Sequence, residues 1–251
     1  MPKQLYRSFQ ALILLALCIF FASKTASGQL TYYINLRFVP LTIFGVILLA
    51  VLAQTMFNEI KRVRHERENE SEHDHDHDHD HAPAPANLLF MLVPLLIGVL
   101  IPARPLDSSA LDTKGFNTNA PLVSADSSAQ LFETDSEERN ILDWIKLFNY
   151  EKDPTQFIGQ KASVIGFVYS DDSLAKNQFF VSRFVISCCA ADGFAIAMVG
   201  EWDQAHTLEK DSWVLVKGPV QVITLHGQSV PLIEAESVQV VPVPEQPYLI
   251  P

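Results

Sequence analysis

Residues 38–57 read FVPLTIFGVILLAVLAQTMF, a run of 20 residues without a charged side chain. A helix needs about 20 consecutive apolar residues to cross the hydrocarbon core of a bilayer. Shorter apolar runs lie on either side, FQALILLALCIFFA at 9–22 and LLFMLVPLLIGVLIP at 88–102. The sequence therefore predicts a membrane α-helical part at residues 1–105 with two to three spans, whose apolar faces contact the lipid bilayer.

Lys and Arg are distributed unevenly around these runs. Lys3 and Arg7 precede the first run, and four basic residues follow the second, namely Lys61, Arg62, Arg64 and Arg67. Because basic residues are enriched on cytoplasmic loops, we expect a multi-pass protein of the bacterial plasma membrane. Its N-terminus and the loop at about 61–87 would be cytoplasmic, and the chain after residue 105 extracytoplasmic. The first run could instead be a cleaved signal peptide, which would leave this orientation unchanged.

Charge and motif content limit the classes of function. The formal net charge of −11 lies entirely after residue 105, where 20 acidic residues accompany nine basic ones. Nucleic-acid binding needs a basic surface, so that class is excluded. A Gly-rich phosphate loop, a Gly-x-Ser-x-Gly elbow and a His-Glu-x-x-His motif are all absent from the sequence. The sequence therefore predicts a protein that is not an enzyme.

Residues 72–81 read EHDHDHDHDH, within the predicted cytoplasmic loop. Such a run cannot bury a core, so a flexible segment is expected. Imidazole and carboxylate groups bind Zn²⁺ and similar divalent ions, and residues two apart in an extended chain project the same way. The run predicts weak, exchangeable metal binding by His73, His75, His77, His79 and His81. A solvated acidic loop with no role in metal binding is the alternative.

The chain after the helices divides into a predicted linker and a predicted β domain. Residues 106–134 are rich in Ser, Asp, Asn and Ala without periodicity, which is typical of a linker. A helix is predicted at about 136–150, preceded by capping-box spacing at Thr134. Short β-type runs follow at 162–169, 178–189, 194–199, 213–225 and 230–241. One helix before about five strands favours a mainly-β domain at 135–251, a small OB-like barrel whose closure removes exposed edges.

Residues 185–193 read VISCCAADG and contain two of the three cysteines. Strand alternation predicts Cys188 in the core and Cys189 on the face of Arg183, whose guanidinium would favour a thiolate. Three interpretations stay open. The thiols could be simple packing, or a redox pair in an oxidising compartment. They could also ligate a divalent metal, and the candidate ligands for that interpretation are Cys188, Cys189, Asp192, His206 and His226.

Several segments together resemble a known bacterial family. They are RFVISCCAAD at 183–192, WVLVKG at 213–218, and the closing residues Pro244, Pro247 and Tyr248. The sequence resembles, over nearly its whole length, a family whose members are named as permease subunits. The resemblance implies an accessory subunit beside a multi-pass permease in the same membrane, with a link to a divalent metal such as zinc. A membrane-anchored thiol redox protein, or an assembly factor with an OB-like binding domain, are the alternatives.

Overall fold

The computed structural model describes residues 3–69, 86–116, 132–225 and 227–251. They form two compact units, which are treated separately below. The helical unit contains Met1–Leu30 and Leu36–Arg104, and the β unit contains Thr31–Asn35 and Pro105–Pro251. The predicted metal-binding histidines from His73 to His81, and His226, lie outside the described residues.

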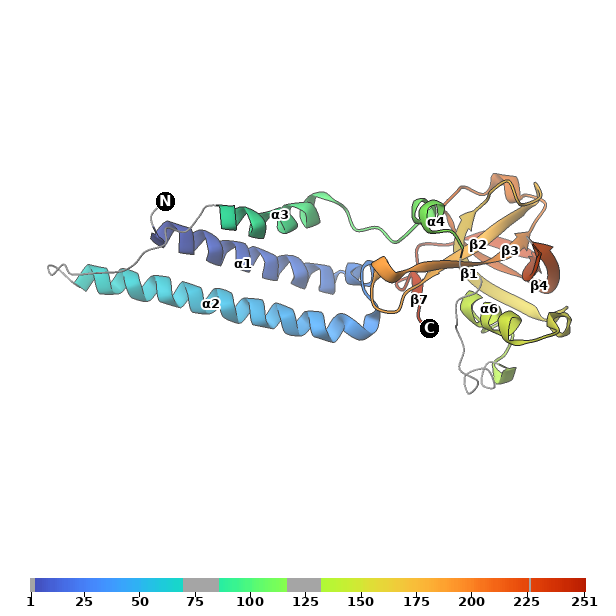
Figure 1. Ribbon diagram of the computed structural model, residues 1–251, viewed down its shortest axis with the longest axis horizontal. Coiled ribbons are helices and arrows are strands. Elements are labelled where there is room, and N and C mark those ends of the chain that lie inside the picture. Colours follow the sequence, from blue (N-terminus) through green and yellow to red (C-terminus); the bar gives the residue numbers. More distant parts are fainter. Residues whose placement is uncertain (1–2, 70–85, 117–131, 226) are drawn as a thin grey trace. The chain divides into compact units, whose positions relative to one another are not determined.

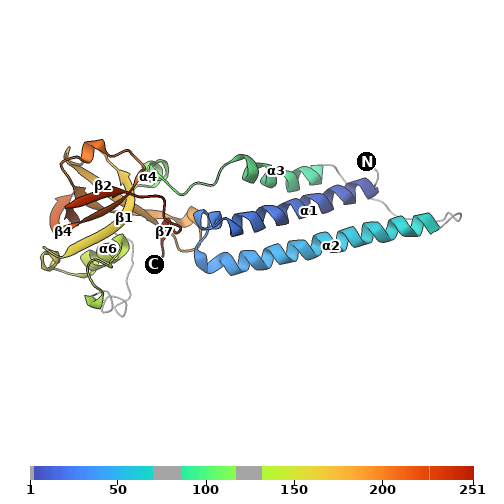
Figure 2. The ribbon, with the colours of Figure 1, turned by 180° about the vertical axis from the view of Figure 1, so that it is seen from behind.

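The helical unit consists of α1 (Lys3–Ala26), α2 (Val39–Asn69) and α3 (Ala86–Leu100). α1 packs along both α2 and α3 (Figures 1 and 2). Within the described part of the chain, two helical segments are long and apolar enough to cross a membrane, Leu5–Ala26 and Leu36–His65. The predicted apolar helical N-terminal part is confirmed. α3 has 15 residues, fewer than the roughly 20 that a span requires, so a third span stays a prediction.

In its described residues, the β unit contains seven strands with short helices before and between them. The helical elements at its start are α4 (Ser108–Lys114), α6 (Ile141–Tyr150) and the 3₁₀ turn η3 (Pro154–Phe157). The strands are β1 (Lys161–Tyr169), β2 (Gln178–Val185), β3 (Phe194–Glu201), β4 (Trp213–Leu225), β5 (Gln228–Glu234), β6 (Ser237–Val240) and β7 (Tyr248–Leu249). Its other 3₁₀ turns among the described residues are η4 (Ala190–Asp192) and η5 (Ala205–Thr207). Between α1 and α2 lie two more, η1 (Gln29–Tyr32) and η2 (Leu36–Phe38), and η2 belongs to the helical unit.

Strand pairing in this unit returns to its starting point. β1 pairs with β2, β2 with β3, β3 with β5, β5 with β4, and β4 again with β1. The β3–β5 pair is parallel and the other four are antiparallel, so the sheet is mixed. β6 extends along β4, and the short β7 lies parallel to β2. A predominantly β C-terminal domain is confirmed, and it is a mixed sheet.

β4 changes partners near its middle, and two residues explain how. Pro219 cannot donate a ladder hydrogen bond, and pairing with β5 begins at the next residue, Val220. At Gly218 an added Cβ would lie 2.0 Å from the carbonyl oxygen of Glu234. Glycine therefore allows the end of β5 to approach the β4 backbone closely. The exchange of neighbours along one long strand is what brings β5 between β3 and β4.

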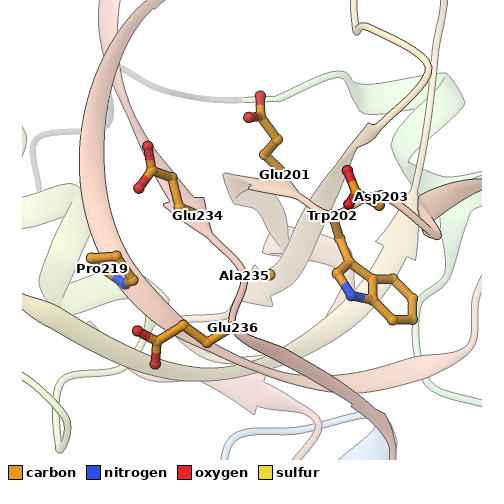
Figure 3. Close-up of a pocket in the computed structure, with 7 residues that line it drawn as sticks. All are labelled: Glu201, Trp202, Asp203, Pro219, Glu234, Ala235 and Glu236. Atoms are coloured by element: carbon orange, nitrogen blue, oxygen red, sulfur yellow. The ribbon is translucent and has the colours of Figure 1, made fainter.

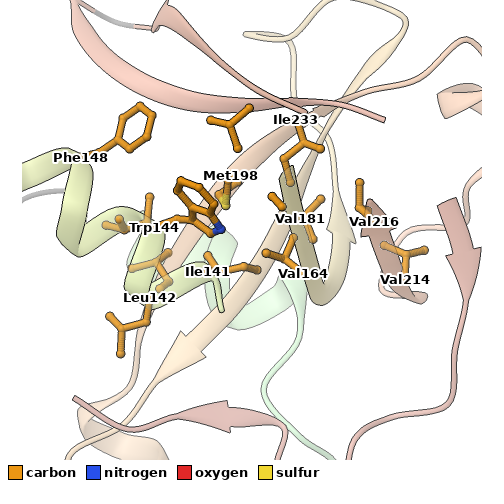
Figure 4. Packing of buried hydrophobic residues seen from close by; sticks show 14 of the residues in the cluster. Ile141, Leu142, Trp144, Phe148, Val164, Val181, Met198, Val214, Val216 and Ile233 are labelled. Atoms are coloured by element: carbon orange, nitrogen blue, oxygen red, sulfur yellow. The ribbon is translucent and has the colours of Figure 1, made fainter. Parts of the chain in front are cut away.

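The core lies between α6 and the strands. Asn140 accepts hydrogen bonds from the backbone N–H groups of Leu142 and Asp143, and Asp143 bonds back to the Asn140 N–H, forming a capping box. The helix then buries its apolar face, and Trp144 and Met198 are both fully buried (Figure 4). α4 and α6 lie on opposite sides of the strands (Figure 1).

Four predictions about local structure need correction. The predicted helix at 136–150 begins at Ile141, because Asn140 caps it and Thr134 does not. The predicted linker at 106–134 opens with α4, which packs through the buried Leu111. The strand predicted at 178–189 ends at Val185, and that predicted at 230–241 is interrupted at Ala235. There the Ala235 N–H turns to the carbonyl of Glu201 on β3.

Candidate functional site

The two adjacent cysteines lie in the loop that joins β2 to β3, residues 186–193, called the cysteine loop below. Its first residue, Ile186, is buried and donates its N–H to the carbonyl of Leu249, so it extends the β2–β7 pairing. Beyond Ile186 the chain leaves the sheet and turns through η4. Gly193 returns it to β3 with an N–H bond to Ala190 O of 3.3 Å.

Asp192 holds the turn together from within. One carboxylate oxygen accepts the N–H of Cys188 at 2.7 Å, and the other accepts the N–H of Ser187 at 3.2 Å. Burial acts to raise the pKa of Asp192, but hydrogen bonds from the Cys188 thiol and from these N–H groups outweigh it and lower the pKa. A charged carboxylate therefore fixes the backbone that carries both cysteines.

A segment distant in sequence binds the same loop. Residues Thr31–Asn35, called the connector below because they join α1 to α2 along the chain, belong to the β unit. The Asn35 N–H donates to Cys188 O at 3.0 Å, and the Asn35 side chain donates to Ser187 O at 2.9 Å. The Ala190 N–H donates to Tyr33 O at 2.8 Å, and Ile34 and Cys189 pair as an isolated antiparallel bridge. The cysteine loop is thus the docking site of the connector.

Lys114 of α4 secures the other side of the cysteine loop. Its Nζ donates to Gly193 O at 2.9 Å and Ala191 O at 3.0 Å. α4 is itself fixed by Asp211, whose carboxylate accepts the N–H and hydroxyl of Ser108 at 2.8 and 2.7 Å. The loop therefore has three supports, namely Asp192, the connector and α4.

Both thiols are free, and their environments differ. The two Sγ atoms are 3.6 Å apart, Cys188 is exposed and Cys189 is half-buried. The pKa of Cys188 is raised to about 11, chiefly by its hydrogen bond to the Asp192 carboxylate and next by Cys189. The pKa of Cys189 is lowered, first by the backbone N–H of Ala191 and then by the Cys188 thiol. The pair therefore contains one thiol that retains its proton and one that ionises more readily.

The structure corrects two predictions about this pair. Cys188 is exposed instead of buried, because β2 ends at Val185 and strand alternation no longer applies three residues later. Arg183 does not act on Cys189. The residue is 8% exposed, and its guanidinium lies 5.2 Å from the centre of the Trp213 ring. The guanidinium donates to the carbonyls of Pro247, Gln246 and Ile165 at 3.0, 2.6 and 3.2 Å. Burial lowers its pKa to about 10. Arg183 instead binds the C-terminal tail.

His206 does not lie with the cysteines. It is exposed in η5, which follows β3, whereas the cysteine loop precedes β3. Eight residues of strand separate the two ends by about 23 Å. Among the residues that the structure describes, no group of three or more His, Cys, Asp and Glu is arranged to hold a metal ion. The described donors at the cysteine loop are the two thiols and Asp192.

An acidic pocket of about 390 Å³ lies at the far end of β3. Its lining includes Trp202 and the side chains of Glu201, Asp203, Glu234 and Glu236. The carboxylates point in different directions around it and do not converge on one point (Figure 3). The Glu201 carboxylate accepts a hydrogen bond from the side-chain amide of Gln178 at 2.8 Å.

No sequence pattern indicated Asn35 and Lys114, which bind the cysteine loop, or the partners of Tyr248. The Tyr248 hydroxyl accepts the N–H of Leu106 at 2.8 Å and donates to Tyr32 O at 2.9 Å, joining the tail, the chain entering α4 and the connector. The closing Pro-Tyr signature was the one available signal, and it indicated Tyr248 without indicating its partners. Asn35 and Lys114 lie 153 and 74 residues before Cys188, where no local spacing relates them to it.

The described residues combine apolar N-terminal helices, two of them long enough to cross a membrane, with a C-terminal mixed-sheet domain. Two family models divide the chain between them, the DUF1980 N-terminal domain at residues 9–117 and the DUF1980 C-terminal domain at residues 113–251. The chain belongs to the DUF1980 family.

Two relatives extend this assignment. The chain is 32% identical over 283 residues to "UPF0703 protein YcgQ" of Bacillus subtilis, which covers 96% of this chain and 98% of that protein. It is 23% identical over 201 residues to a "Putative two-component membrane permease complex subunit" of Streptococcus mutans, covering 64% of this chain and 72% of that protein. A small single-stranded DNA-binding protein of Streptomyces coelicolor aligns over 33% of this chain and 93% of its own, at 15% identity and a TM-score of 0.23. A TM-score this low gives no information about the fold or the ligands of this chain.

Proposed function

We propose that this chain is a non-enzymatic accessory subunit of a two-component membrane permease. The observation that carries the proposal is the relationship to the Streptococcus mutans protein, whose name describes a subunit of such a complex. The exposed apolar side chains of the helical unit support it. On α2, Leu41 and Phe44 are 65% and 64% exposed, and on α3 Phe90 is 80% exposed. Surfaces of this kind require lipid or partner helices around them.

The proposed arrangement places the β unit outside the cytoplasm and the N-terminus and His-rich loop inside. Basic residues in the first turns of α1 and after the apolar part of α2 support this orientation. The connector supports it independently, since a segment between two spans docks on the cysteine loop and must lie on the same side of the membrane as the β unit. α3, if it spans, returns the chain to that side.

We further propose that the closed pairing of β1, β2, β3, β5 and β4 is an OB-like barrel. Five strands in this order, with β3 parallel to β5, close without leaving a free edge in the circuit. Small barrels of this kind bind ligands through a strand face and adjoining loops. The cysteine loop, between β2 and β3, adjoins such a barrel.

Handling of a divalent metal such as zinc is part of the proposal. Its support is the composition of the His-rich loop, His73 to His81, together with the two thiols of the cysteine loop. The unequal pKa values of Cys188 and Cys189 favour a second candidate, a membrane-anchored thiol redox protein. Trapped mixed disulfides with client proteins, absent after Cys189→Ser, would support that candidate.

Site-specific photocrosslinking tests the permease proposal. A photoreactive amino acid replaces Phe44, which is exposed, or Ala53 in the same helix, which is 2% exposed and serves as the matched control. The account predicts a crosslink from position 44, and not from position 53, to a multi-pass membrane protein. Crosslinking of position 44 to lipid alone in native membranes would contradict it.

A further inference from the structure

We propose that Cys188 and Cys189 form an open chelating site for one soft divalent cation, and that occupancy of this site is transmitted to the connector between α1 and α2. This inference deepens the proposed function and rests on it, because it gives the permease subunit a ligand class and a route to its membrane helices. The geometry of the thiols carries the first half, and the hydrogen bonds of the connector carry the second.

The two sulfur atoms already have nearly the separation that chelation requires. They are 3.6 Å apart in the structure. Two thiolates bound to one tetrahedral zinc at about 2.3 Å lie about 3.8 Å apart. A soft cation can therefore bind between them with little movement of the loop. Thiolate ligands select such ions over Mg²⁺ and Ca²⁺, which prefer oxygen.

The surroundings indicate an open and exchangeable site instead of a closed structural one. Cys188 is exposed and Cys189 half-buried, so solution ions reach the pair. Asp192 is the one further donor described beside the thiols, and both of its oxygens are already engaged by backbone N–H groups, which leaves the two sulfur atoms as the ligands that the loop presents. Two coordination positions would therefore remain for water or another ligand, as in sites where the metal is exchanged or passed on.

Packing alone does not account for the pair. A buried cysteine can serve as a small apolar side chain, but the side chain of Cys188 lies on the surface. Hydrogen bonds instead fix the backbone of the cysteine loop, so that both sulfur atoms are held at its surface or partly exposed. Asp192 and Lys114 fix the backbone on either side of them.

Backbone hydrogen bonds and a β-bridge also connect the two cysteines, and the residue that follows them, to the connector. Cys188 O accepts the Asn35 N–H, Ile34 pairs with Cys189, and the next N–H, of Ala190, donates to Tyr33 O. Chelation by adjacent residues would immobilise both side chains and the peptide between them. Loss of motion in the loop then reduces opening of the connector hydrogen bonds, with no large movement required.

The test uses the full-length chain, reduced and metal-free in detergent, titrated with Cd²⁺ as the probe. The ultraviolet thiolate-to-metal absorption band reports sulfur ligation, which the histidines of the cytoplasmic loop cannot produce. We expect saturation at one Cd²⁺ per chain and competition by Zn²⁺. Cys188→Ser and Cys189→Ser should each weaken Cd²⁺ binding by more than about tenfold. Loss of a residue that only hydrogen-bonds to a metal ligand already weakens metal binding by about that factor, and loss of a ligand should weaken it more. Cys18→Ser, which alters the remaining cysteine in α1, should leave the titration unchanged.

Hydrogen exchange in the same sample tests transmission. On addition of Cd²⁺ the amides of Asn35 and Ala190 should exchange roughly tenfold more slowly, which corresponds to about 1.4 kcal/mol. Absence of the band in the unsubstituted chain would overturn the metal site, even if a serine variant failed to fold. A normal band with unchanged or faster exchange would overturn the transmission. Neither result depends on a permease partner, so failure of this inference is distinguishable from failure of the proposed function.

Discussion

Replacing Asp192 with asparagine should loosen the cysteine loop and at the same time make Cys188 more reactive. The carboxylate accepts two backbone N–H groups, from Ser187 and Cys188, one on each oxygen. Asparagine has one acceptor oxygen, so one N–H loses its partner. For an exposed hydrogen bond the net loss is about 1 kcal/mol, or roughly fivefold faster amide exchange.

The effect on the thiol follows from the hydrogen bond to Asp192, the largest cause of the raised pKa of Cys188. That pKa is about 11, against an ordinary value of 9.0. If the substitution removed the whole pKa shift of Cys188, the thiolate fraction near neutral pH would rise about 100-fold. A less basic thiolate is also a weaker nucleophile, so the alkylation rate of Cys188 would rise by at most about tenfold.

Iodoacetamide labelling of the reduced, metal-free protein, resolved by peptide mass spectrometry, measures this rate. Asp153→Asn is the matched control, since Asp153 is an exposed carboxylate that accepts a backbone N–H at 3.1 Å from Thr155 and does not contact either cysteine. Slower or unchanged labelling of Cys188 in Asp192→Asn, with the control behaving as the parent, would refute the proposed role of Asp192.

Three further predictions concern the β unit. In the reduced, metal-free parent near neutral pH, Cys189 should be alkylated before Cys188 despite its lower exposure, because its pKa is lowered and that of Cys188 is raised; labelling of Cys188 first would contradict this. Gly218→Ala places a Cβ 2.0 Å from Glu234 O and should destabilise the unit by about 3 kcal/mol, a loss of about 6–12 °C in Tm. Gly45→Ala in α2, where an added Cβ has no atom within 4 Å, should not lower the Tm. Tyr248→Phe should cost about 2 kcal/mol through its lost hydrogen bonds. Burial raises the pKa of Tyr248 to about 12, so the folded state retains a proton that the unfolded chain releases near pH 10. The free energy of unfolding should therefore fall between pH 10 and 12, and it should fall less steeply in the Phe variant. Urea unfolding at each pH measures this difference.

The elements that could be predicted are those whose signal is local. The apolar runs indicated α1 and α2 because length and composition alone identify a helix able to span a membrane. The bounds of β4, Trp213–Leu225, agree with the predicted strand, and the buried face of α6 agrees with the predicted apolar spacing. Each of these depends on residues a few positions apart.

The cysteine loop was not predictable because its shape depends on distant partners. Apolar Val185 and Ile186 gave no indication that β2 ends between them, and the connector, whose Asn35 N–H donates to the Cys188 carbonyl, lies about 150 residues away in the sequence. Arg183 lies within β2, as predicted. Its contacts are nevertheless set by the C-terminal tail, whose return past β2 no local pattern encodes. The interruption at Ala235 likewise depends on β3.

The most direct test of the central claim is purification of the full-length chain from its native membranes in a mild detergent, followed by quantitative mass spectrometry of the proteins that accompany it. If the chain is an accessory subunit of a two-component permease, one multi-pass membrane protein should co-purify in a fixed ratio to it. That ratio should persist in the Cys188→Ser variant, since the helices and not the thiols would make the contact. Recovery of the chain alone, under conditions that keep other membrane complexes of the same preparation intact, would contradict the account.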